Sequence, residues 1–185
     1  METEAAAPTR DLAPHTAVVR AAPRDHGLIA SIIVRPGRDQ RTVVTDGVLD
    51  PEEGLVGDDW KERGSRFMAD GSSDPEAQLT IMSTRVLAAI EPDEARWPLA
   101  GDQLLADLDI SDENLPVGAR LRIGEAEVVV TGRPHTGCAK FAERFGHDAL
   151  RWISTPEGRA LRMRGLYVRV VRRGAIRVGD EITKA

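Results

Sequence analysis

The alternation of apolar and polar residues along the chain predicts short β-strands separated by glycine and proline turns. A β-branched run over residues 28–34 is followed by a Pro-Gly pair, which indicates a strand and then a turn. The stretch 41–54 predicts another short strand followed by a loop. Apolar runs at 77–82 and 102–110 predict two further strands.

The clearest β-signal covers residues 117–132, with the sequence VGARLRIGEAEVVVTG. Leu121 and Ile123 alternate with arginines, a Gly-Glu pair turns the chain, and valines bring it back. This pattern predicts a β-hairpin. Residues 166–174 and 175–182 predict the last strand pair of the chain.

Helical patterns interrupt the strands at two places before residue 147. Ser83 precedes a run whose apolar side chains share one helical face, so we expect it to cap a helix. A second helix is predicted to begin at Cys138 and to end at Gly146, because glycine is a common helix terminator.

The segment 147–165 continues with a helical pattern, and its last helix can begin in two ways. Ser154 can cap this helix, with Glu157 completing a capping box. Alternatively, Thr155 can cap it, with Pro156 at the first helical position. The sequence leaves both starts open.

About seven short strands with helices between them indicate a mainly β fold. Because the strands rarely alternate with long helices, a doubly wound parallel sheet is disfavoured. We expect a closed, mostly antiparallel β-barrel, Greek-key-like, with short helical insertions. Residues 1–26 lack periodicity and predict a flexible tail, which leaves one domain over 27–185. The long Gly-, Ser- and acid-rich stretch 54–77 is a loop of a kind that is often functional.

Composition narrows the cellular setting. The single cysteine excludes a disulfide framework and a zinc site built from several thiolates. No apolar run reaches the ~18 residues of a membrane span, and the first residues do not form a secretory signal. We therefore expect a cytoplasmic protein in a reducing compartment, with no membrane partner.

Charge is unevenly distributed along the chain. The net charge is −5, yet residues 133–178 hold 11 Lys and Arg against 3 Asp and Glu, which leaves −13 for the remainder. Such clustered cations form either a solvated face or a positive field for an anion. Nucleic acid is disfavoured as a partner, because this segment has few aromatic residues and the pI of the chain is 5.4.

The lone cysteine is the first candidate for chemistry. Cys138 lies between His135 and Lys140, and Arg133 is nearby. Cations and a helix N-terminus stabilise a thiolate, the nucleophilic form of cysteine, and Gly137 would allow another group to approach closely. A lone cysteine is also often a small buried hydrophobic residue. A reactive thiol and an inert one therefore both stay open.

Other polar residues have weaker claims on a site. Asp58 follows Gly57, and Asp102 also follows a glycine; acids in such turns either brace loops or reach a site. Gln78 and Thr80 share one face of their strand, which either lines a pocket or meets solvent. The chain lacks the G-x-S-x-G, H-E-x-x-H and P-loop motifs, which disfavours the hydrolase, zinc-protease and nucleotide-binding classes that carry them.

The ordered set of motifs resembles the MOSC domain, the module at the C-terminal end of molybdenum cofactor sulfurases. The resemblance rests on GLVGD at 54–58, AQLTIMS at 77–83, GDQL at 101–104 and LPVGARLRIGEAEVVVTGRPHTGCAKFAERFG at 115–146. It covers approximately residues 28–182. The order of these motifs is specific, whereas any single one would not be.

The resemblance implies a barrel fold and places Cys138 at the family's characteristic cysteine, which carries sulfur or contacts molybdenum in a pterin cofactor. We expect Cys138 to be catalytic, supported by His135 and Lys140. Cofactor contacts are expected from Arg133, Thr136, Gly137, Gly57, Asp58, Asp102, Gln103 and Gln78. The cofactor is phosphorylated, which gives the basic segment 133–178 a plausible ligand.

The chain departs from the family pattern at three places. Gln103 stands where asparagine is frequent, and Trp60 stands near the position of a frequent histidine. The helical segment 147–165 is longer than a minimal version and could cover the site as a lid. Cofactor sulfurases also carry a pyridoxal-phosphate desulfurase domain, but the only lysines here give no sign of a Schiff base: Lys61, Lys140 and Lys184. We expect no internal pyridoxal-phosphate site and, where sulfur is needed, a separate sulfur-donor protein.

Three functions follow from these expectations. In the first, Cys138 carries sulfur or binds the cofactor's metal, and the protein is a sulfurtransferase or a reductase of N-hydroxylated compounds. In the second, a non-catalytic barrel holds the anionic cofactor and delivers it to a partner molybdoenzyme. In the third, the barrel is structural and its cysteine is inert.

Overall fold

The computed structural model describes residues 9–185, and the first eight residues lie outside that range. Strands in the described residues are β1 (Gly27–Val34), β2 (Thr42–Val44), β3 (Asp46–Asp50), β4 (Gly54–Leu55), β5 (Leu79–Ser83), β6 (Leu104–Asp107), β7 (Arg120–Ile123), β8 (Ala126–Val130), β9 (Leu166–Arg172), β10 (Gly174–Arg177) and β11 (Glu181–Lys184). Strands form in each region where the sequence predicts one, but the stretch 41–54 forms three short strands instead of one, and the strand predicted over 175–182 is divided between β10 and β11.

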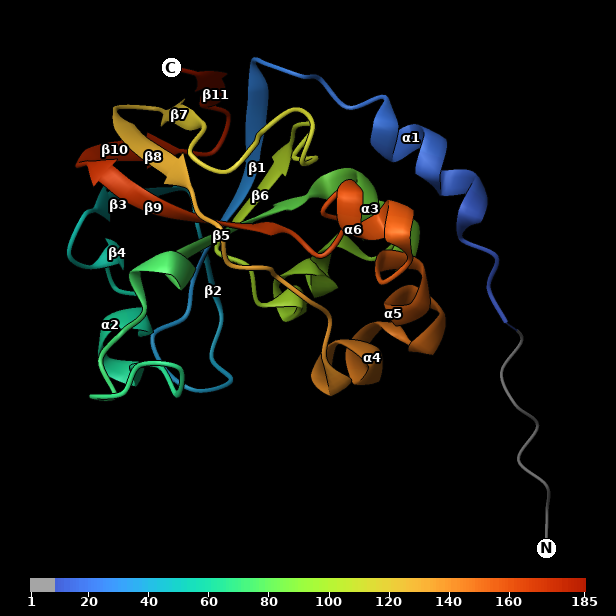
Figure 1. Cartoon of the computed structure of the whole chain (residues 1–185), viewed down its shortest axis with the longest axis horizontal. Coiled ribbons are helices and arrows are strands. Elements are labelled where there is room, and N and C mark those ends of the chain that lie inside the picture. The colour runs from blue at the N-terminus through green and yellow to red at the C-terminus, as the bar shows by residue number, and fades with distance from the viewer. Residues whose placement is uncertain (1–8) are drawn as a thin grey trace, which may run out of the picture.

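Seven of these strands close into a barrel (Figure 1). Their order is β11-β7-β8-β9-β5-β6-β1, and β1 returns to β11 through the pairing of Gly27 with Ile182. The pairing of β5 with β6 is parallel, whereas the other six pairings of the ring are antiparallel. A separate sheet holds β10, β3 and β4, and β2 extends the barrel sheet from β1. The expected closed, mostly antiparallel barrel is confirmed.

The expected hairpin over 117–132 is confirmed as β7 and β8, with Ile123 opposite Ala126. The expected last strand pair is wrong, because β9 and β10 do not pair with each other. β9 already has a partner on each edge, β8 and β5, so the chain leaves the barrel and β10 pairs with β3. Gly174 makes this departure possible, since a Cβ there would lie 2.3 Å from the backbone nitrogen of Ala126.

Short helices fill the connections. The α-helices among the described residues are α1 (Thr16–Arg20), α2 (Trp60–Arg63), α3 (Thr84–Ile90), α4 (Ala139–Phe145), α5 (His147–Ile153) and α6 (Pro156–Ala160). The 3-10 helices are η1 (Ala13–His15), η2 (Pro75–Ala77) and η3 (Glu94–Ala100). All the α-helices except α2 gather on one side of the barrel (Figure 1).

The helix ends follow the side-chain caps that the sequence offers. Ser83 caps α3 as expected, with its hydroxyl accepting the N–H of Arg85. Of the two starts left open for α6, the structure has the second: Thr155 accepts the N–H of Gly158, and Pro156 begins the helix.

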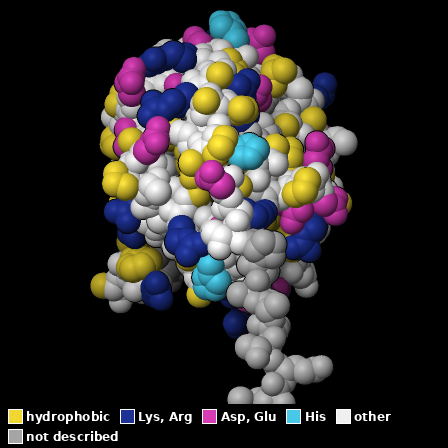
Figure 2. Space-filling view, turned by 90° about the vertical axis from the view of Figure 1, so that its right-hand side faces the viewer, with side chains coloured by type: hydrophobic (Ala, Val, Ile, Leu, Met, Phe, Trp, Pro, Cys, Tyr) yellow, Lys and Arg dark blue, Asp and Glu magenta, His cyan; other side chains and the backbone are white. Residues whose placement is uncertain are grey.

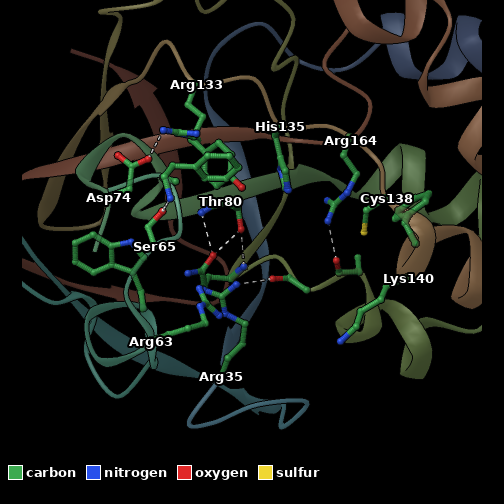
Figure 3. Close-up of a pocket in the computed structure, with 18 of the residues that line it drawn as sticks. Arg35, Arg63, Ser65, Asp74, Thr80, Arg133, His135, Cys138, Lys140 and Arg164 are labelled. Atoms are coloured by element: carbon green, nitrogen blue, oxygen red, sulfur yellow. Dashed lines mark hydrogen bonds and ion pairs between the residues drawn. The ribbon is translucent and has the colours of Figure 1, made fainter. Parts of the chain in front are cut away.

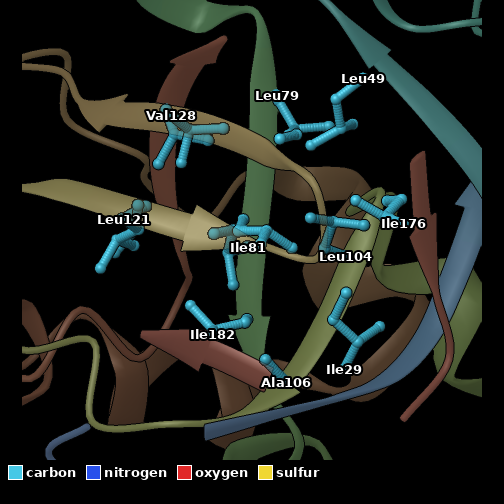
Figure 4. Close-up of a cluster of buried hydrophobic side chains, with 14 of the residues drawn as sticks. Ile29, Leu49, Leu79, Ile81, Leu104, Ala106, Leu121, Val128, Ile176 and Ile182 are labelled. Atoms are coloured by element: carbon cyan, nitrogen blue, oxygen red, sulfur yellow. The ribbon is translucent and has the colours of Figure 1, made fainter. Parts of the chain in front are cut away.

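Two hydrophobic cores follow from the alternation of side chains along the strands. Aliphatic residues such as Ile29, Ile81 and Leu104 point into the barrel and form its interior (Figure 4). Their chain neighbours, including Met82 and Leu105, point outward and pack against α3, α4 and α5. The central strands are therefore buried on both faces and read as continuous apolar runs.

The N-terminal segment differs from the tail expected over residues 1–26. Its first eight residues lie outside the described range, but Leu12 and Val19 are buried in the helix-side core. The Arg10 side chain donates hydrogen bonds to the carbonyls of Ile90 and Phe145. Helices as short as η1 and α1 have little stability of their own, so this tertiary packing, which periodicity does not reveal, holds the segment in place.

The helix-bearing face offers no wide apolar area in the part that residues 9–185 form. Hydrophobic side chains occur there in small groups among charged side chains of both signs (Figure 2). Within the same residues, none of the helices combines the length and the apolar character that crossing a membrane requires. The cytoplasmic location stays a prediction.

Candidate functional site

A cavity of about 400 Å³ lies where three parts of the chain converge (Figure 3). The loop after β1, the segment from α2 to η2, and the segment 133–144 supply most of its wall. Thr80 on β5 and Tyr167 on β9 line it from the barrel. We call it the cationic cavity, because these eight positive side chains line it: Arg35, Arg41, Arg63, Arg66, Arg133, Lys140, Arg144 and Arg164.

Three of the arginines are held in place by buried or nearly buried acids. Arg35 binds both carboxylate oxygens of Asp58, and Arg164 donates to Asp102 at 2.7 Å; both carboxylates are fully buried. Arg133 lies 2.5 Å from Asp74, the one acidic residue among those lining the cavity. These pairs fix where the guanidinium groups point. The acids lie at or below the cavity wall, so an anion could still approach the cations.

Arg41 is a cation without such an acid. Its Nε is buried and has no hydrogen-bond partner among residues 9–185. Burial lowers the pKa of Arg41, and the positive charges of Arg35 and Arg144 lower it further. A buried unpartnered donor beside repelling cations is costly, so this corner of the cavity is suited to a bound anion.

Cys138 lines the cationic cavity and is exposed, which excludes a buried thiol. It is the residue that precedes α4, so it stands at the strand-to-helix junction that the sequence predicted. Lys140 also lines the cavity and forms an ion pair with Asp39 at 3.4 Å. Figure 3 shows Cys138, Lys140 and Arg164 toward the same side of the cavity.

His135 lines the cavity as well, but it is not the cation that the sequence suggested. Its side chain is only 11% exposed. Burial, and then the positive charges of Arg164 and Arg35, hold the pKa of His135 well below its usual value. The imidazole is therefore neutral at pH 7. The positive charges on the same side of the cavity as Cys138 come from Lys140 and Arg164.

The other residues expected to contact a cofactor divide into groups. Arg133 and Gln103 line the cationic cavity, where Gln103 accepts hydrogen bonds from the hydroxyl and backbone N–H of Thr80. Asp102 is buried, and burial raises its pKa against the opposing effect of Arg164. Gln78 does not line this cavity, because its amide bonds the backbone of Pro51 and Val170.

Four expected contacts face other hollows. Gly57 and Asp58 line a separate cavity of about 320 Å³. Thr136 and Gly137 line a second cavity of about 370 Å³, which shares His135 and Arg164 with the first. The cationic cavity therefore brings together five of the expected residues: Cys138, His135, Lys140, Arg133 and Gln103.

The sequence analysis missed the cations that come from the first third of the chain: Arg35, Arg41, Arg63 and Arg66. It also missed Phe67, whose exposed ring lies 4.9 and 4.8 Å from the guanidinium carbons of Arg66 and Arg133. The unusual length of the loop over 54–77 was the available signal. Its arginines could not be placed, because their meeting with residues 133–144 depends on barrel closure.

Comparison with known proteins agrees with this fold. The family model for the MOSC domain matches residues 69–183, which is more than half of the chain. A search of curated proteins finds no match. YuaD from Bacillus subtilis is 17% identical with a TM-score of 0.63, over 84% of this chain and 94% of that one.

Two structures of YiiM are also similar. YiiM from Geobacillus stearothermophilus is 17% identical with a TM-score of 0.60, over 86% of this chain and 75% of its own. YiiM from Escherichia coli is 19% identical with a TM-score of 0.55, over 85% of this chain and 69% of its own. At such identities the likeness concerns the fold, and the function has to be argued from the cavity.

Proposed function

This chain belongs to the MOSC domain family, and from that premise we propose that its cationic cavity binds the molybdenum cofactor, with Cys138 in contact with the metal. One observation carries the proposal: eight cations and an exposed thiol line one cavity of about 400 Å³ that contains a single acid.

The charge and the chemistry of the cavity fit an anionic pterin. A phosphorylated ligand needs donors with positive charge, and Arg41 has a buried Nε without a partner among the described residues. A thiolate is a soft ligand that suits a soft metal centre. Within residues 9–185, no three or more His, Cys, Asp and Glu side chains form a metal-binding group. The pterin would therefore bring the metal, and Cys138 would add one protein ligand.

Each part of the cavity wall would have its own task. Arg41, Arg63 and Arg66 would hold the phosphate by charge-assisted hydrogen bonds. Lys140 and Arg164, which lie toward the same side of the cavity as Cys138, would attract the anionic ligand to the side that holds the thiol. When bound, the cofactor supplies two-electron redox and sulfur chemistry. The protein would then be a sulfur carrier or sulfurtransferase, or a reductase of N-hydroxylated compounds.

An alternative is a non-catalytic module that holds the cofactor and passes it to a partner molybdoenzyme. The composition of the wall favours this role, because many cations accompany only one thiol. In a delivery module the arginines would carry the affinity, and loss of the thiol would matter little. A carrier or an enzyme would instead depend on Cys138.

Expression in a host that makes the cofactor separates these roles. Molybdenum and pterin would be measured in freshly purified protein, for the unchanged chain and for Cys138→Ser and Arg41→Gln. We expect Cys138→Ser to lose molybdenum and Arg41→Gln to lose pterin. Arg169→Gln, at an exposed arginine of β9 that does not line the cavity, is the matched control and should keep both.

The outcomes lead to different conclusions. If Cys138→Ser keeps its metal while Arg41→Gln loses the pterin, the delivery module is the correct role. If the unchanged chain carries neither molybdenum nor pterin from that host, the cofactor proposal fails. Thiol alkylation adds a second readout, because bound cofactor should slow the reaction of the exposed Cys138.

A further inference from the structure

Two buried polar atoms face each other below the cationic cavity without a hydrogen bond. Asp102 Oδ1 and His135 Nδ1 are 3.6 Å apart, and neither has a hydrogen-bond partner within residues 9–185. The other oxygen of Asp102 accepts from Arg164 at 2.7 Å. Leaving such atoms unpaired costs about 1–3 kcal/mol each, so their opposition calls for a functional explanation.

The backbone around the pair leaves them room to meet. Gly165 has a φ of +105°, and a Cβ on it would lie 3.2 Å from both Asp102 Oδ1 and His135 Nδ1. The ring of Tyr167 lies 4.6 Å from the ring of His135 and supports it from β9. A side chain at residue 165 would crowd both atoms, so the glycine permits their approach.

The two nitrogens of His135 have different surroundings. Nδ1 is fully buried beside Asp102 and has no hydrogen-bond partner among the described residues. Nε2 does not share this buried, unpaired state. The ring lines the cationic cavity and the second cavity. With the proton on Nδ1 directed at the carboxylate, Nε2 keeps a free lone pair.

The charged and titratable groups that act on His135 come from three other parts of the chain. Arg35 follows β1, and Asp102 follows η3. Arg164 lies in the turn before β9, and Tyr167 lies near the start of β9. Burial, and then the two arginines, keep the ring neutral by lowering its pKa. An anion bound between them would offset their charge and make proton uptake by the ring easier.

We propose that Asp102 is a positioning residue that holds the Nδ1–H of His135, so that Nε2 meets the bound ligand as a proton acceptor. The inference rests on the proposed function only in that the cavity binds an anion. The present 3.6 Å is longer than a hydrogen bond, and such contacts often shorten when a ligand closes the site. Proton uptake at His135 is then coupled to anion binding.

Nitrogen NMR of the ¹⁵N-histidine-labelled full chain tests the first part without any cofactor. We expect His135 in the Nδ1–H form near pH 7. In Asp102→Asn, an amide N–H can point at Nδ1, so the ring should change to the Nε2–H form. His147, exposed at the start of α5, is the internal control and should not change.

The second part is tested with sulfate, whose charge is constant over this range of pH. Sulfate affinity should rise as pH falls from 7.5 to 5.5, by up to tenfold per pH unit for one coupled proton. His135→Gln should remove most of this dependence while keeping the fold, which a circular dichroism spectrum checks.

An Nε2–H form of His135 in the unchanged chain would overturn the inference. So would a pH dependence that survives in His135→Gln, or a complete lack of sulfate binding. Should Asp102→Asn fail to fold, the form of the ring in the unchanged chain still decides the first part. If the chain binds no pterin but His135 has the expected Nδ1–H form, the cofactor proposal fails and this inference stands.

Discussion

Arg41 illustrates how a single side chain can be costly to the free protein and useful to the complex. Its neighbours Arg35 and Arg144 repel it, and its buried Nε finds no acceptor in the described residues. Charges of this kind persist at binding sites because a ligand of opposite charge removes the cost. A substitution of this residue should therefore affect the stability of the free protein and its binding of an anion differently.

Arg41→Gln is expected to leave the free energy of unfolding unchanged or to raise it by up to about 1 kcal/mol, because a repulsion is removed. The same change should weaken sulfate binding about tenfold or more, since a hydrogen bond from a charged donor contributes about 1.5–3 kcal/mol. Urea unfolding and a sulfate titration provide the two numbers. Arg169→Gln should alter neither, and a large stability loss in Arg41→Gln would contradict the assignment.

Sequence reasoning at this scale succeeded where the neighbours were local. Cys138 and Lys140 could be joined because both stand in one short run, and both line the cavity. The family resemblance predicts a cofactor contact at Asp58, but a Gly-Asp pair does not show whether the acid will meet a ligand or an arginine. The structure places it against Arg35, where it orients the guanidinium that reaches the cavity.

The helical segment 147–165 shows what a single cap decides at the scale of an element. Thr155 accepts the N–H of Gly158 and also donates to the carbonyl of Trp152, so one hydroxyl joins the end of α5 to the start of α6. Gly158 and Ser154 line the second cavity. The cap thereby shapes a wall that His135 also borders.

Thr155→Ala is expected to lower the free energy of unfolding by about 1 kcal/mol, as is typical for loss of an N-cap. Ser154→Ala, one residue earlier, should change it by less than about 0.5 kcal/mol, because Ser154 does not cap α6. Urea unfolding of both variants is the measurement. Equal losses in the two variants would favour the capping box that the structure does not show.

Elements whose partners are near in sequence were predictable, and those with distant partners were not. The hairpin of β7 and β8 needs only its own alternation and its glycine turn. The pairing of β10 with β3 depends on both edges of β9 being taken, which no local pattern encodes. The same reason explains why the packing of α1 was missed.

At the scale of the whole molecule, ion pairs join acidic and basic side chains both across distant segments and within local ones. Lys140 lowers the pKa of Asp39, and Arg96 lowers that of Glu91. His135 has a lowered pKa for a different reason, its burial among cations. Carboxylates with lowered pKa stabilise the fold above their unfolded values, and a histidine with lowered pKa does so above its unfolded value near 6.5.

Stability should therefore decline in two phases as the solution is acidified. The first begins below pH 6.5, as the unfolded chain takes up the proton that folded His135 refuses. The second begins below the ordinary carboxyl values of 3.8–4.5, as the unfolded chain takes up the protons that Asp39 and Glu91 resist in the folded protein. Urea unfolding between pH 3 and 8 measures both phases.

Two controls assign the phases. His135→Gln should remove the first phase and leave the second. Added salt should weaken the second phase of the stability loss, because the ion pairs responsible for it are on the surface. Salt should affect the first phase less. A free energy of unfolding that stays level down to pH 3 would contradict the whole account.

The seam between β1 and β11 has a consequence for how the protein is made. Gly27 pairs with Ile182, so the barrel can close only after the strand that holds residue 182 has been synthesised. Arg41 and Arg164, which both line the cavity, are synthesised far apart in time. A nascent chain therefore has no finished pocket to load before that strand has left the ribosome, and the ligand must arrive after this point.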